Sequence, residues 1–191
     1  MRTIGFFLLV GLLPVTGCSD LFDPEGDSTV TLDDDSFYEQ IGAAIVACAV
    51  AIYNQNLAGK PAGTHQITTS GPLGGMVTIT GTTSIDQTHD ITAVDLSYDL
   101  DEVGCSTVFS SADTEWALTL TLTGTLTHKG SFGGISGDYS DETYAGTALH
   151  IMASSAYNDD IVRTTDETGD VTIHRQNDHI SGVVLGHAIS W

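Results

Sequence analysis

Apolar residues recur at the spacing of an α-helix along residues 36–56. One stripe of this helix is formed by Ile41, Ala44, Ile45, Cys48 and Ile52. The remaining faces are also mostly small or apolar, which predicts that the middle of the helix is buried on several sides. Ser36 followed by Glu39 fits a capping box, so we expect Ser36 to cap the N-terminus. The continuous apolar part, residues 41–53, is too short to span a bilayer.

From about His65 onward the pattern changes to an alternation of apolar and polar residues, which is typical of β-strands. The clearest strand is residues 116–128, where leucines occupy one face and threonines the other. Residues 76–86 and 91–100 are joined by a link short enough for a hairpin. After a turn at residues 129–134, further strands are predicted at residues 144–154, 161–165, 170–175 and 180–190.

These elements amount to about eight antiparallel strands and one helix. The expected fold class is mainly β: an antiparallel curved sheet, a sandwich or a small barrel, with one buried N-terminal helix. Both the helix and the inward strand faces need apolar cover, so we expect residues 41–53 to pack into the concave face of the sheet. The residues expected on that face are Val94, Leu96, Leu118, Leu120 and Leu122.

The N-terminal segment has the organisation of an export signal. Arg2 gives a positive start, and residues 4–13 form an apolar run that is too short for a membrane span. Small residues then precede a cysteine in the motif Val15-Thr16-Gly17-Cys18, which resembles the lipobox of bacterial lipoproteins. The resemblance implies that the signal is cleaved before Cys18 and that Cys18 is acylated. Two or more acyl chains give stable membrane anchoring.

This resemblance divides the chain into three parts. Residues 1–17 are the expected signal peptide, residues 18–35 a lipidated acidic tether, and residues 36–191 a single β-rich domain that contains the helix. The tether is too acidic and too poor in apolar residues to order itself. The implied location is the bacterial cell envelope, lipid-anchored on the outer membrane or the cell surface. The alternative is an ordinary secretory signal that contains a cysteine.

The chain is strongly acidic, with five Lys and Arg residues against 25 Asp and Glu residues and a formal net charge of −20. Removal of Arg2 with the signal leaves 4 − 25, or −21, on the side chains of the mature protein. Such a surface repels nucleic acid and anionic head groups. The expected contact with a membrane is therefore through the lipid alone, and the charge identifies no protein or small-molecule partner.

Two cysteines remain once Cys18 is lipidated: Cys48 in the helix and Cys105 beyond the end of the predicted strand 91–100. In an oxidising compartment this even pair predicts a disulfide that pins the helix to the sheet. The bridge would close a loop of about 58 residues and stabilise the fold by roughly 4 kcal/mol. Two buried free thiols are the alternative.

The sequence offers little catalytic chemistry. No GxSxG elbow, P-loop or GxGxxG pattern occurs. Asp138 with Asp141 and Glu142, and Asp166 and Glu167 with Asp170, are expected to be solvated acidic turns, with weak calcium contacts as an alternative. No acid stands alone in an apolar stretch, where its pKa would be raised. We therefore predict no catalytic residue, no metal site and no cofactor.

The histidines likewise show no HxH or HExxH spacing, and we expect them to be scattered over the surface and the sheet. They are His65, His89, His128, His150, His174, His179 and His187.

These observations favour a non-enzymatic binding or structural module of the cell envelope. The alternative is a small barrel that carries an apolar ligand, as lipocalin-like folds do; the apolar helix counts against it, and an empty pocket larger than about 300 Å³ would favour it. A third possibility is an outer-membrane barrel, because Val183, Leu185 and Ile189 alternate before Trp191. His187 interrupts that stripe.

Overall fold

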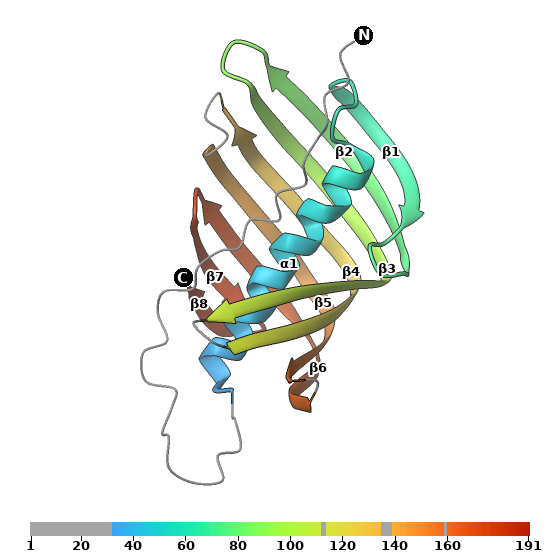
Figure 1. Cartoon of the computed structure of the whole chain (residues 1–191). Coiled ribbons are helices and arrows are strands. Elements are labelled where there is room, and N and C mark those ends of the chain that lie inside the picture. The colour runs from blue at the N-terminus through green and yellow to red at the C-terminus, as the bar shows by residue number, and fades with distance from the viewer. Residues whose placement is uncertain (1–31, 112–113, 135–138, 159) are drawn as a thin grey trace, which may run out of the picture.

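A computed structural model describes residues 32–111, 114–134, 139–158 and 160–191 (Figure 1). The described chain contains one helix, α1 (Asp34–Asn56), followed by eight strands. The strands are β1 (Gly63–Ser70), β2 (Met76–Asp86), β3 (Ile91–Ser111), β4 (Thr114–Gly133), β5 (Tyr139–Tyr157), β6 (Asp160–Gln176), β7 (His179–Val184) and β8 (His187–Ser190). The predicted class, mainly antiparallel β with one helix, is confirmed. The expected signal peptide, the lipobox-like motif with Cys18 and most of the expected acidic tether lie outside the described residues.

The strands form one sheet in chain order, β1 to β8, and each strand is antiparallel to the next. The sheet curves, and α1 lies along its concave side (Figure 1). Within the described residues β1 and β8 do not pair, so the sheet remains open. A closed barrel, one of the forms expected from the sequence, is therefore not what these strands build.

The helix begins two residues earlier than expected, and its N-terminal cap is Asp33. The Asp33 carboxylate accepts a hydrogen bond of 2.7 Å from the backbone N–H of Ser36. The prediction that Ser36 is the cap was therefore wrong, because Asp33 supplies the same type of acceptor three residues earlier. Asp34 and Asp35 occupy the first turn, where the helix dipole favours negative charge.

The helix and the sheet share one apolar core. Eleven residues of α1 are buried, among them Phe37, Ile41, Ile45 and Ile52. The five strand residues expected on the concave face are all buried in the same cluster. The predicted packing of the helix against β3 and β4 is thus confirmed. Burial of this kind contributes roughly 1.5–3 kcal/mol for each large apolar side chain.

By length and composition alone, the whole of α1 is long and apolar enough to cross a membrane. Its central apolar run, residues 41–53, is too short to do so by itself. About two-thirds of its most apolar window is buried inside the domain. The apolar residues of α1 therefore form part of the core that the helix shares with the sheet.

The hairpin of β3 and β4 is longer than the sequence predicted. Strand β3 continues through an irregularity between Leu100 and Val103, where Glu102 has φ 51°. Cys105 therefore lies within β3 and not beyond its end. The outer parts of both strands run across α1 (Figure 1). Cys48 and Cys105 form the predicted disulfide there, with their Cα atoms 5.8 Å apart.

Four other segments differ from the expected pattern. Residues 129–133, expected in a turn, continue β4. Both acidic stretches lie partly or wholly in strands: Asp141 and Glu142 are in β5, and Asp166, Glu167 and Asp170 are in β6. Residues 180–190 form two strands and not one, because Leu185 (φ 51°) and Gly186 (φ 87°) turn the chain. Turn residues with positive φ end strands that apolar alternation alone would continue.

Candidate functional site

A cavity of about 300 Å³ lies where the C-terminal end of α1 meets β4, β5 and the turn between β6 and β7. The helix contributes Val50, Tyr53 and Asn54. The strands and the turn contribute His128, Phe132, Gly133, Tyr139, Ser140, Glu142, Arg175, Asn177 and Asp178. Aromatic, amide and charged groups thus meet at one end of a core that is otherwise apolar.

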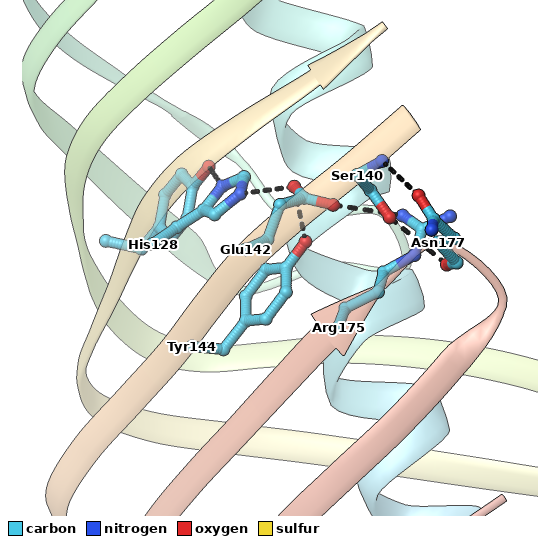
Figure 2. Close-up of polar contacts among 7 residues, drawn as sticks. His128, Ser140, Glu142, Tyr144, Arg175 and Asn177 are labelled. Carbon is cyan, nitrogen blue, oxygen red and sulfur yellow. Dashed lines mark hydrogen bonds and ion pairs between the residues drawn. The ribbon is translucent and has the colours of Figure 1, made fainter. Parts of the chain in front are cut away.

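A buried carboxylate, Glu142, organises the inner wall of this cavity. Its side chain is 1% exposed. One carboxylate oxygen accepts hydrogen bonds from His128 Nε2 at 2.7 Å and from the Tyr144 hydroxyl at 2.9 Å. The other accepts from Arg175 Nη1 at 3.2 Å. Figure 2 shows these three side chains converging on Glu142. Three donors, one of them a cation, replace the hydrogen bonds that this carboxylate would make with water.

The His128 ring is 1% exposed and has a partner on each nitrogen. Nε2 faces Glu142, and Nδ1 lies 3.2 Å from the Tyr98 hydroxyl. A neutral imidazole with its proton on Nε2 satisfies both contacts, because Nδ1 then accepts from Tyr98. The ring also stacks on Tyr144, with the centroids 4.4 Å apart and an interplanar angle of 17°. His128 is therefore locked in orientation by hydrogen bonds and by packing.

The two buried tyrosines act as hydrogen-bond donors. Burial raises the pKa of Tyr144 far above its usual range, and the neighbouring charge of Glu142 adds to the shift. Burial also raises the pKa of Tyr98, with further contributions from Tyr53 and Glu142. Both hydroxyls consequently remain protonated well above neutral pH. Among the described residues, no fully buried side-chain nitrogen or oxygen lacks a hydrogen-bond partner.

Arg175 connects the buried network to the open part of the cavity. Its side chain is 33% exposed. In the described part of the chain its guanidinium donates one hydrogen bond, to Glu142. A guanidinium carries five N–H donors, so Arg175 can offer others to a ligand while Glu142 holds it in place.

The mouth of the cavity is fixed by a clamp between the start of β5 and the turn after β6. The backbone N–H of Ser140 donates to Asn177 Oδ1 at 3.2 Å, and the Ser140 hydroxyl donates to the Asn177 carbonyl at 3.1 Å (Figure 2). The Asn177 N–H in turn donates to the Ser140 carbonyl at 2.8 Å. Asn177 has φ 55°, a conformation that asparagine tolerates better than most residues.

A glycine in β4 allows the strand to approach Glu142 closely. Gly130 pairs with Glu142 in the sheet and has φ 134°. A Cβ atom at this position would lie 2.1 Å from the Asp141 carbonyl oxygen and 2.7 Å from the Glu142 Cα. Only glycine fits this conformation and this spacing. Gly130 therefore belongs to the support of the site although it contributes no side chain.

The sequence-based expectations miss this network. His128 lies in the sheet, which agrees with the expectation of surface and sheet histidines, but its burial beside a carboxylate was not predicted. Glu142 lies in β5 and is buried, so the expectation of a solvated acidic turn was wrong for this residue. The signal was present in the period-two pattern. Glu142 stands two residues before buried Tyr144, and His128 two residues after buried Leu126, on the inward faces of their strands.

The other predicted features have separate places. The disulfide between Cys48 and Cys105 joins α1 to β3, and neither cysteine lines the cavity. His89 and His150 form surface pairs with Asp86 and Asp166, each at 2.7 Å. No group of three or more His, Cys, Asp or Glu side chains placed to hold a metal ion occurs among the described residues.

Comparison of the chain with protein-family models, with curated proteins and with solved structures finds no match. The site therefore has to be interpreted from its own geometry.

Proposed function

We propose that this protein is an exported lipoprotein, anchored in the cell envelope through Cys18, and that its folded domain is a non-enzymatic binding module. The observation that carries the binding role is the cavity of about 300 Å³ with its preorganised wall. Such concave sites with a few fixed polar groups are typical of small-molecule binding. The anchor is supported by the motif Val15-Thr16-Gly17-Cys18.

The hydrogen bonds of the buried residues His128 and Glu142 favour a binding role over a catalytic one. A general base needs a lone pair that can reach the substrate. Both ring nitrogens of His128 already face protein partners, and Glu142 accepts three hydrogen bonds. These contacts orient Arg175 and rigidify the wall, which is the role that a binding site requires of its supporting residues.

The alternative role, a carrier of an apolar ligand, is less well supported. Helix α1 occupies the concave face that such a ligand would use, and the disulfide of Cys48 and Cys105 holds the helix to β3. A lipid-sized ligand would have to displace the helix. Saturable one-to-one binding of a fluorescent fatty acid would favour the carrier over the proposed module, and we expect no such binding.

The anchor is tested by replacing the acylated residue. Cys18→Ser should abolish labelling by an alkyne fatty acid and release the protein from the membrane fraction. Ser19→Ala, the matched control at the next position, should remain labelled and membrane-bound. Membrane association of Cys18→Ser without any lipid label would contradict the lipoprotein assignment.

A further inference from the structure

The charges around the cavity disfavour anionic ligands. Arg175, the one Lys or Arg among the described residues of its lining, is already paired with the buried carboxylate of Glu142. Asp178 adds an exposed carboxylate to the lining, and the whole chain has a formal charge of −20. An incoming anion would therefore meet a neutralised arginine inside a repulsive field. What Arg175 still offers is hydrogen-bond donors.

The lining combines flat apolar surfaces with planar polar groups. Tyr53 and Phe132 pack edge to face, with ring centroids 5.1 Å apart and an interplanar angle of 87°. Asn54 and Asn177 belong to the same lining; the Asn54 amide carries donors and an acceptor, and the Asn177 amide, whose Oδ1 already accepts from Ser140, still has its two N–H donors. A matching ligand needs an apolar C–H face together with groups that both donate and accept hydrogen bonds.

We propose that this cavity binds an uncharged polyhydroxyl ligand, namely a sugar ring, either free or at the end of a glycan. A hydroxyl donates and accepts at once, so it suits Arg175 and the two asparagines together. The C–H face of a pyranose ring suits the aromatic surface of Tyr53 and Phe132. This inference rests on the binding role proposed above and adds the ligand class.

The size of the cavity agrees with this class. About 300 Å³ is at the lower end of small-molecule sites, which suits one or two sugar rings. A hexose has about 12 non-hydrogen atoms, and ordinary ligand efficiency then predicts a dissociation constant on the order of 1 mM.

The test is a titration of the purified full chain with sugars. Binding is measured by calorimetry and by changes in the amide signals of Asn54, Phe132 and Asn177. The neutral probes are glucose, galactose and mannose. The anionic counterparts are glucuronate for glucose, galacturonate for galactose and mannuronate for mannose. We expect at least one neutral sugar to saturate on the order of 1 mM and its anionic counterpart to bind at least roughly tenfold more weakly.

Disaccharides of the bound sugar distinguish the two sources. At least roughly tenfold tighter binding of the disaccharide indicates a glycan end, and equal affinity indicates a free sugar; either result supports the ligand class. The proposal is overturned if no neutral sugar saturates by about 100 mM, far above the expected constant, or if an anionic counterpart binds as tightly as the neutral sugar.

Variants locate the ligand in the cavity. Asn54→Ala removes an exposed amide, and Phe132→Leu keeps an apolar side chain but removes the flat ring; each should weaken binding at least roughly tenfold. Gln55→Ala, at the exposed neighbouring position outside the lining, should bind as the wild type does. Folded Asn54→Ala and Phe132→Leu proteins with wild-type affinity would overturn the site. The Cys18 assay is independent, so an anchored protein that binds no sugar contradicts the ligand class and leaves the anchor intact.

Discussion

The concave face of the sheet forms the groove that holds α1. The two ends of this groove are built from the same strands, but their inward side chains differ. Toward the N-terminal half of the helix, the inward positions of β4 are Leu118, Leu120 and Leu122, and all three are buried. Toward its C-terminal end, β4 presents His128 and β5 presents Glu142 on the inward faces. One end is an apolar core, and the other is a hydrogen-bonded wall beside a cavity.

This difference separates stability from recognition along one sheet. The apolar end gains from burial and from the disulfide, and its one fully buried polar side chain, Ser155, donates a hydrogen bond of 3.1 Å to Gln40. At the polar end every buried donor and acceptor needs a hydrogen-bond partner. Once these bonds are made, the polar groups beside the cavity are held rigidly in fixed positions.

The largest effect is expected from a charge placed in the apolar end. Ile45 is fully buried, so Ile45→Asp loses its packing and buries an unpaired carboxylate, which should lower the free energy of unfolding by about 5 kcal/mol. The urea midpoint measures the loss. Ala47→Asp, on an exposed position of the same helix, should change stability by no more than about 0.5 kcal/mol. Equal midpoints for the two variants would show that the helix is not buried at Ile45.

Removal of the disulfide should have the next largest effect. Cys48 and Cys105 are separated by 57 residues, so the double variant Cys48→Ser/Cys105→Ser should lose about 4 kcal/mol on the chain-entropy model. Denaturant unfolding measures the loss, and wild-type protein under a reducing agent serves as the matched control. A reduced wild type as stable as the oxidised protein would contradict this contribution.

At the polar end, Glu142→Gln should lower the free energy of unfolding by about 3 kcal/mol. Arg175 loses its buried counter-charge, and His128 and Tyr144 lose a charged acceptor. Asp141→Asn, at the exposed preceding position, should be nearly neutral. Amide exchange sharpens the comparison: Tyr144 should lose more protection than Leu120 at the apolar end. A uniform loss of protection along β4 and β5 would mean that the two ends unfold as one unit.

The smallest effect is a loss of stability in alkaline solution. The pKa of Tyr144 is raised in the folded protein, so its contribution is fully present below the unfolded pKa of about 10 and is lost as the pH rises toward the folded pKa. At pH 11 this loss is about 1.4 kcal/mol for one such tyrosine. Tyr144→Phe should flatten the pH dependence by that amount in urea titrations between about pH 9 and 11. The exposed control Tyr139→Phe should follow the wild-type curve.

The sequence predicts the elements well where one physical signal dominates. The helix, the leucine face of residues 116–128 and the pairing of Cys48 with Cys105 all follow from apolar spacing and cysteine number. The limits of the strands do not, because Lys129 to Gly133 contains two glycines and reads as a turn, whereas pairing with β3 and β5 extends the strand. Local composition is overridden there by hydrogen bonds to neighbouring strands.

The candidate site is harder to predict, because its residues come from separate strands. His128, Glu142 and Arg175 lie on β4, β5 and β6, and no spacing in the chain connects them. Each occupies an inward position next to a buried apolar residue in the period-two pattern. Treating every polar residue at an inward position as buried would have identified all three, but the register that brings them together is set only by the pairing of the whole sheet.

The order of the strands has a consequence for how the chain folds. Each strand pairs with its neighbour in sequence, so the sheet can grow one hairpin at a time with small loops to close. The helix is the exception: it comes first, yet Gly42 lies against Ile189 in the last strand. During synthesis, the apolar surface of α1 therefore has no complete cover until β8 is present. We therefore expect the packing of α1 against the sheet to be completed late in folding, with its apolar surface exposed until then.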